Sequence, residues 1–236
     1  MSPFGDLFAD KSRGLLMGNR GGRLHDDQRK LTARRWTSKQ WICCKLDFNN
    51  RHRKVWGDSY TELFFLDEVT AFAAGHRPCF ECRRKDAERF ATLFSTVAPH
   101  SAHSRTRVQP SAGPSTGSGG DPALGPRLRG DERVNVARLS AAEIDKILHT
   151  ERLAGKAKRL HRCAIDDLPD GAMIARDGEA FALKGDSLLR WTPHGYDARE
   201  RRPAGIGVDA LTPPSTLAVL RRGYAPLWHR SAEDLT

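Results

Sequence analysis

The chain has 236 residues, of which 39% are hydrophobic and 29% are charged, as is ordinary for a globular protein of one large or two small domains. It contains no run of about 18 apolar residues, and residues 1–10 include acids without an apolar core. These features argue against a membrane span and a secretory signal, so we expect a soluble, cytoplasmic protein. The net charge of +10 favours a polyanionic partner, of which nucleic acid is the commonest.

The positive charge is concentrated near the N-terminus. Residues 11–60 hold 13 Lys and Arg against four Asp and Glu, an excess of +9. A solvated basic surface is the alternative to a nucleic-acid contact. Phosphate contacts would give affinity without sequence specificity. The candidate phosphate contacts are Arg20, Arg23, Arg34, Arg35, Arg51, Arg53 and Arg77.

The first 60 residues predict one hairpin. Residues 1–20 look irregular, whereas 36–48 read as a strand with large apolar side chains. Asn49-Asn50 is a turn signal, and 51–56 read as the returning strand. A further short strand is expected over 61–66.

Two helices should follow. Asp67 is a suitable N-cap for a helix that runs to about Ala74, and Gly75 is its expected stop. A second helix is expected after Cys82, with Phe90 on its apolar face.

Residues 99–133 differ from the rest of the chain. They are rich in Ser, Gly, Pro and Arg, so they lack the apolar surface needed to fold. Either a late insertion or an interdomain linker explains this composition.

The remaining chain predicts a helix and then strands. Ser140 with Glu143 forms a capping box. Residues 163–236 look β-rich, with Asp177-Gly178 as a hairpin turn. We therefore expect an α+β protein: a small N-terminal zinc-binding module of a hairpin and short helices over 1–98, an insertion or linker over 99–133, and a helix with a small β-rich domain over 134–236.

The cysteines carry the clearest chemical signal. Their number is five, and an odd count without a secretion signal favours metal or thiol chemistry over disulfides. Cys79 and Cys82 form a C-x-x-C, a spacing that lets two thiolates bind one metal ion. A redox pair and two buried small side chains are the alternatives, but a thioredoxin-like motif needs the pair at the start of a helix after a central strand, and here a helix precedes it.

A structural zinc site needs four ligands. Cys43 and Cys44 are the obvious further ligands, but adjacent side chains on a strand point to opposite faces, so only one reaches the ion easily. The fourth ligand is then the other cysteine or a histidine, and the candidates are His25, His52 and His76.

Part of this region is similar to a known family. Phe64-Phe65, the run Ala-Phe-Ala-Ala-Gly-His-Arg-Pro-Cys-Phe-Glu-Cys over 71–82, and Arg83 resemble the second half of the Ada-type metal-binding domain, the zinc domain of the bacterial protein that repairs methyl phosphotriesters in DNA. The resemblance implies a zinc-bound, DNA-contacting fold over about residues 30–95, with Cys79 and Cys82 as zinc ligands and Arg77 as a phosphate contact.

The sequence also departs from this family. The family places its other two ligands in a C-x-x-x-C, the first being the methyl acceptor, whereas this chain has Cys43-Cys44 and a longer gap to Cys79. We therefore expect zinc-dependent nucleic-acid binding, to DNA rather than RNA because of the resemblance, linked to DNA repair or regulation. An enzyme acting on DNA, either a thiolate alkyl acceptor or a metal-dependent nuclease, is one alternative, and a zinc-stabilised protein-interaction module is another. The sequence assigns no catalytic residue.

Overall fold

The structure, a computed structural model, describes residues 1–50, 54–97 and 138–235. Its N-terminal part contains a four-stranded sheet of β1 (Leu16–Asn19), β2 (Ile42–Lys45), β3 (Leu63–Phe65) and β4 (Arg77–Pro78), in the order β3-β1-β2-β4. β1 is antiparallel to both β2 and β3, and β2 is parallel to β4. The short strand expected over 61–66 is confirmed as β3.

Two predictions for this region are wrong. The first 20 residues are not irregular throughout, because β1 lies inside the sheet. The predicted hairpin is not found among the described residues, because β2 pairs with β1 and residues 54–56 form no strand. Gly18 weakens the strand signal of β1, yet a Cβ there would lie 2.2 Å from the carbonyl oxygen of Ile42. The close approach of β2 therefore requires glycine at this position.

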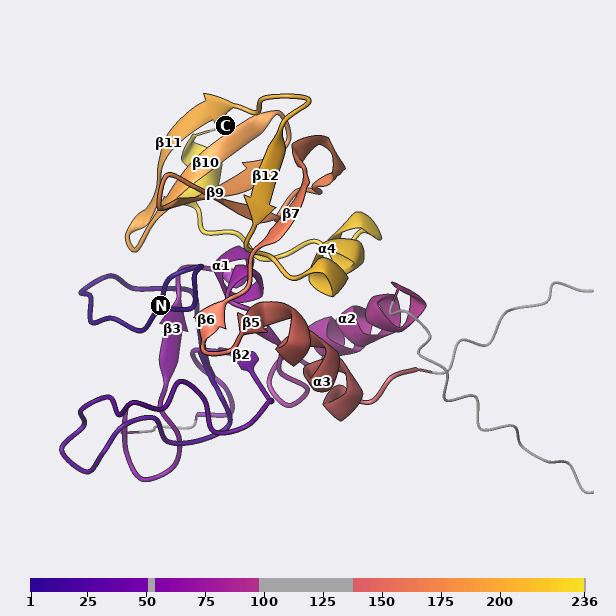
Figure 1. The fold of residues 1–236 in the computed structure, drawn as a ribbon. Helices are drawn as coiled ribbons and strands as arrows, with labels where there is room; N and C mark the ends of the chain where they lie inside the picture. The colour runs from indigo at the N-terminus through magenta and orange to yellow at the C-terminus, as the bar shows by residue number, and fades with distance from the viewer. Residues whose placement is uncertain (51–53, 98–137, 236) are drawn as a thin grey trace, which may run out of the picture.

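Helix α1 (Glu68–Ala73) is buried along its whole length and lies between the two large sheets of the molecule (Figure 1). Its ends are as predicted. Asp67 caps it by accepting a hydrogen bond from the Thr70 amide at 2.8 Å, and Gly75 follows with a φ of 85°.

Three longer helices pack together beside α1. They are α2 (Arg84–Val97), α3 (Ala141–Arg152) and α4 (Pro214–Arg221). The helix predicted after Cys82 is confirmed as α2, and the capping box at the start of α3 is present. Their shared core contains Phe72, Phe90, Phe94, Ile144, Leu148, Val219 and Tyr224. No helix among the described residues is long and apolar enough to cross a membrane.

The C-terminal part is a six-stranded antiparallel sheet of β7 (His161–Ala164), β8 (Met173–Arg176), β9 (Glu179–Lys184), β10 (Ser187–Thr192), β11 (Gly195–Arg201) and β12 (Gly207–Ala210). The strand order in this sheet is β11-β10-β9-β8-β12-β7. The predicted hairpin at Asp177-Gly178 joins β8 to β9. A two-stranded ribbon of β5 (Leu153–Ala154) and β6 (Ala157–Lys158) follows α3, and α5 (Ser231–Asp234) lies near the C-terminus. A 3-10 turn over Ile165–Asp167 follows β7.

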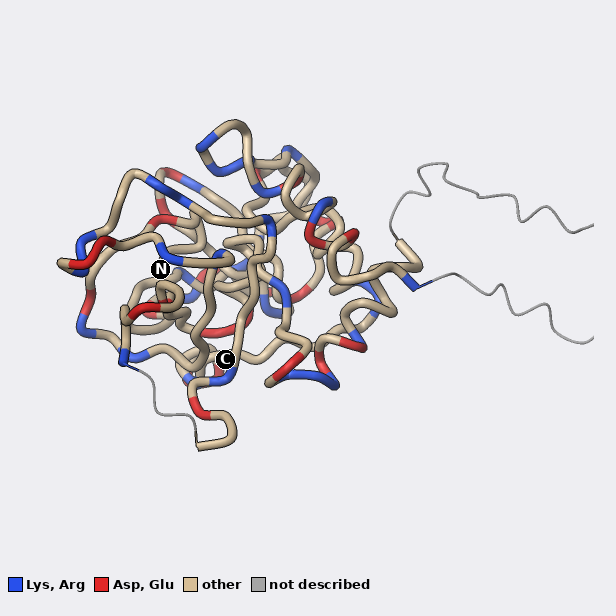
Figure 2. Tube along the Cα trace, turned by 90° about the horizontal axis from the view of Figure 1, so that it is seen from below, with Lys and Arg blue, Asp and Glu red and all other residues tan. Residues whose placement is uncertain are grey.

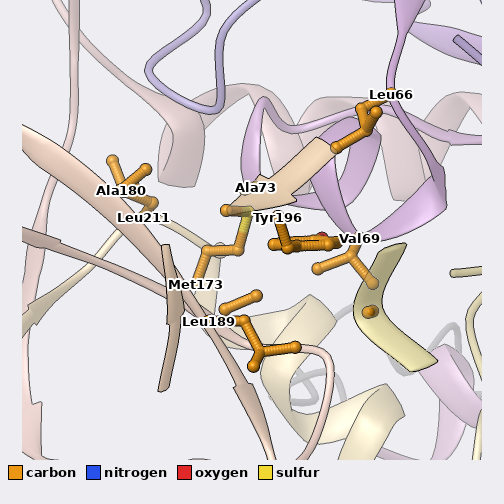
Figure 3. Packing of buried hydrophobic residues seen from close by; sticks show 10 residues of the cluster. Leu66, Val69, Ala73, Met173, Ala180, Leu189, Tyr196 and Leu211 are labelled. Carbon is orange, nitrogen blue, oxygen red and sulfur yellow. The ribbon is translucent and has the colours of Figure 1, made fainter. Parts of the chain in front are cut away.

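The N-terminal and C-terminal parts of the chain share a hydrophobic core around α1. Val69 and Ala73 of α1 pack with Met173, Leu189 and Tyr196 of the six-stranded sheet (Figure 3). The Tyr196 hydroxyl also donates a hydrogen bond of 2.9 Å to the buried carboxylate that caps α1. The expected α+β class is confirmed, and the described parts of the segments 1–98 and 134–236 meet at this core. The insertion predicted over 99–133 lies outside the described residues.

Candidate metal centre

Three cysteines from two segments of the N-terminal region meet at one point. Cys44 lies on β2, Cys79 follows β4, and Cys82 precedes α2. Their Sγ atoms all lie within 4.8 Å of one another, and all three residues are buried. Tetrahedral zinc with Zn–S bonds of about 2.3 Å separates its sulfurs by about 3.8 Å. The three thiols are therefore close enough to bind one such ion after a small contraction.

Backbone hydrogen bonds hold the C-x-x-C turn against β2. The Cys79 amide donates to the Cys43 carbonyl oxygen at 3.0 Å, which continues the parallel pairing of β2 with β4. The Glu81 amide donates to Cys79 Sγ, and the Lys45 amide to Cys82 Sγ, each at 3.4 Å. Because N–H groups favour negative charge on sulfur, these two bonds stabilise the thiolate form that binds metal.

The thiols also perturb one another. Hydrogen bonds from the Cys44 and Cys82 thiols lower the pKa of Cys79 well below its usual value. Hydrogen bonds of Cys44 with Cys79 and Cys82, together with burial, raise the pKa of Cys44. Burial and the mutual repulsion of neighbouring thiolates therefore oppose ionisation of all three sulfurs at once, and a bound cation would offset that repulsion.

A pocket of about 390 Å³ opens over the cluster. Most of its wall is apolar, and Glu62, Glu81 and Lys45 add charged groups. A structural zinc site is closed by four protein ligands, whereas a site that takes a solvent or substrate ligand keeps one position accessible. The lining residues are Met17, Asn19, Ile42, Cys44, Lys45, Leu46, Phe48, Val55, Tyr60, Glu62, Phe64, Cys79, Glu81 and Cys82.

Cys43 does not belong to the cluster, in contrast to its prediction as a metal ligand. It points to the other face of β2, where it packs with Leu16 and Phe65. Its Sγ accepts a hydrogen bond of 3.3 Å from the Arg83 guanidinium, and burial raises the pKa of the thiol. The expected alternation of Cys43 and Cys44 is therefore observed, and Cys44 is the one that faces the C-x-x-C.

The predicted histidine ligands are also placed elsewhere. His25 contacts the Thr61 hydroxyl at 2.6 Å and the Gly57 carbonyl oxygen at 3.0 Å. His76 is fully buried against the rings of Trp41 and Phe65, and burial lowers the pKa of its ring, which favours the neutral form. Among the described residues neither histidine joins the three thiols. His52 lies outside the described residues.

The predicted phosphate contacts divide into buried and exposed groups. Arg77 is buried and forms two hydrogen bonds with Asp145, so it does not face a nucleic acid as predicted. Arg20 is 2% exposed and is likewise unavailable to a backbone passing over the surface. Arg34 is exposed; Arg23 and Arg35 are partly exposed and form ion pairs with Asp27 and Asp6, respectively. Arg51 and Arg53 lie outside the described residues.

Basic residues occur along the whole described trace and are interleaved with acidic ones (Figure 2). The charge excess of the N-terminal sequence therefore does not form one separate basic end of the molecule.

Several pocket residues carried no signal in the sequence. Met17 lines the pocket only because β1 lies inside the sheet, and Glu62 because β3 pairs with β1. Both positions depend on pairings between segments more than 20 residues apart, which local patterns do not reveal.

No family model, curated protein or solved structure matches the chain. The Ada-type resemblance of residues 64–83 therefore stays a prediction.

Proposed function

We propose that this chain is a zinc-binding protein in which Cys44, Cys79 and Cys82 hold the ion. The single observation that carries the proposal is the convergence of three buried thiols within 4.8 Å at the wall of an open pocket. Thiolates are soft ligands that select zinc, copper(I) or iron–sulfur clusters over magnesium and calcium. Zinc is favoured because it needs no redox partner and binds three protein ligands together with a fourth ligand.

Metal content measured on protein purified without chelators tests this proposal. We expect about one zinc per chain, retained in Cys43→Ser and Cys163→Ser and lost in Cys44→Ser, Cys79→Ser and Cys82→Ser. The pair Cys43 and Cys44 is a matched control, because the two residues are adjacent, buried and chemically identical. Equal zinc loss in the two variants would contradict the assignment.

We further propose that the partner is nucleic acid, and DNA rather than RNA on account of the Ada-type resemblance. The net charge of +10 supports it, as does Lys45, an exposed residue at the pocket that adjoins the three thiols. Phosphate contacts release counterions, so affinity should fall steeply as salt is added.

Fluorescence anisotropy with a labelled DNA duplex at low salt measures this binding. Lys45→Glu should weaken it by about fivefold, since it removes one attraction and adds one repulsion near the bound backbone. The matched control is Arg201→Glu on β11, at the other end of the molecule from β2 (Figure 1), which should bind like the wild type. A flat titration with DNA and RNA would instead favour the zinc-stabilised protein-interaction module.

A second candidate is a thiolate alkyl acceptor, which the opening of the pocket onto the three sulfurs favours. In that reaction a thiolate sulfur forms a bond to a methyl carbon of a phosphotriester, the C–O bond breaks, and the phosphodiester leaves with the electron pair. Mass spectrometry after exposure to methylated DNA should then find one methyl group on a pocket cysteine and none on Cys43. Unmodified protein would remove this candidate.

A further inference from the structure

A second pocket, of about 380 Å³, lies between the N-terminus, the end of β1 and the ribbon of β5 and β6. Five cationic side chains line it against one carboxylate, Asp6. We call it the cationic pocket. Its cationic residues are Arg20, Arg35, Arg152, Lys156 and Lys158.

Two of these cations are buried without a carboxylate partner. Arg20 and Arg152 are 2% and 0% exposed, and both guanidinium groups stack on Trp41, at 3.8 and 4.0 Å from its ring centroid. Within the described residues neither forms an ion pair, because Asp6 pairs with Arg35, and Asp145 with Arg77. Removing a cation from water without an opposite charge is strongly unfavourable.

Their hydrogen bonds do not remove this imbalance. Arg20 donates to the carbonyl oxygens of Gly5 and Arg35, and Arg152 to those of Gly75 and Lys39. None of these acceptors carries a negative charge, and neither does the Met1 sulfur that contacts Arg20 or the His149 ring that contacts Arg152. The Nε atoms of both arginines are buried without an acceptor.

A third, partly buried cation adds to the excess. Lys158 donates a hydrogen bond to the carbonyl oxygen of Ala73 in α1, and this acceptor is also uncharged. Burial and the nearby arginines lower the pKa of Lys158 to about 7 and that of Arg20 to about 9. The folded protein thus gathers these three cations at one pocket, where the nearby carboxylates of Asp6 and Asp145 form their ion pairs with other arginines.

We propose that the cationic pocket binds a phosphate monoester, with Arg20, Arg152 and Lys158 around the phosphate and Lys156 at the rim. A doubly charged phosphate matches the excess of cations better than a carboxylate does, and guanidinium groups recognise its oxygens through paired N–H bonds. The phosphate can belong to a small molecule or to the 5′ end of a nucleic-acid strand. This site is separate from the three thiols and does not depend on the function proposed for them.

Calorimetric titration of the full-length, zinc-loaded protein with inorganic phosphate tests the proposal, with chloride at equal ionic strength as the reference. Saturable phosphate binding is expected, together with a higher thermal midpoint. Lys156→Glu should raise the Kd for phosphate by at least about fivefold. Lys146→Glu, the same charge change on an exposed residue of α3 outside the pocket, should leave the Kd within about twofold.

Both substitutions are at exposed residues, so neither threatens the fold, and the zinc content of each sample separates this test from that of the metal centre. A phosphate response no larger than that of chloride would overturn the proposal, as would equal weakening by the two variants. A 5′-mononucleotide and an oligonucleotide with and without its 5′-phosphate then distinguish the two sources. Binding of the oligonucleotide only when it is phosphorylated identifies the strand end, and binding of the mononucleotide alone identifies a small molecule.

Discussion

The ion pair between Arg77 and Asp145 joins the strand before the C-x-x-C to helix α3. Its two hydrogen bonds measure 2.7 and 2.9 Å, and both side chains are buried. Breaking a buried pair from one side destabilises a protein by about 3–5 kcal/mol, because the remaining charge is uncompensated. Asp145 can take up a proton when Arg77 is lost, and burial already raises its pKa. An arginine side chain, in contrast, stays charged in proteins.

The two single substitutions should therefore differ. We expect Arg77→Met to lower the free energy of unfolding by about 3 kcal/mol and Asp145→Leu by about 5 kcal/mol, with the double variant more stable than Asp145→Leu. Urea denaturation measures all three. Arg84→Met, at an exposed ion pair with Glu88, should change stability by less than about 1 kcal/mol. An Arg77→Met protein with normal stability but weakened DNA binding would show that Arg77 is a phosphate contact after all.

Asp67→Ala should lower the free energy of unfolding by about 2–4 kcal/mol, because it removes the N-cap of α1 and the buried acceptor of the Tyr196 hydroxyl. Chemical denaturation measures this, with Tyr196→Phe as a control that removes only the second of these two interactions. Gly75→Ala should destabilise more than Gly178→Ala, since both glycines have φ of 80–85° but only at Gly75 would a Cβ clash, at 2.7 Å from Arg152; equal thermal shifts would refute the clash. The pKa of Lys158 is lower in the folded protein than the usual 10.5, so the folded state binds fewer protons than the unfolded state between about pH 7 and 10.5. The free energy of unfolding should therefore rise with pH across that window in phosphate-free buffer. The slope should be smaller in Lys158→Met.

Local signals in the sequence predicted the helices well. The Asp67 cap, the Gly75 stop and the Ser140 capping box each depend on residues within one helical turn, and all three are present. The turn at Asp177-Gly178 succeeded for the same reason, because a two-residue hairpin is specified by its own residues.

Pairings between distant segments could not be predicted in this way. β1 carries Gly18 and only four residues, so its place between β2 and β3 depends on partners elsewhere in the chain. The burial of Arg77 depends on Asp145, which is 68 residues away, so the residue looked like a surface cation in the sequence.

The metal ligands lie between these two cases. The C-x-x-C spacing predicted a local turn for two thiolates, and strand alternation predicted that only one of Cys43 and Cys44 would join them. The parallel pairing of β2 with β4 determines that Cys44, and not Cys43, points toward the site. This pairing is a long-range contact.

X-ray absorption at the zinc edge of the purified protein tests the central claim most directly, because it counts sulfur ligands around the ion. Three sulfurs at about 2.3 Å and one lighter nitrogen or oxygen ligand are predicted, with the same spectrum in Cys43→Ser. Four sulfurs, or a spectrum that changes when Cys43 is replaced, would contradict a centre built on Cys44, Cys79 and Cys82.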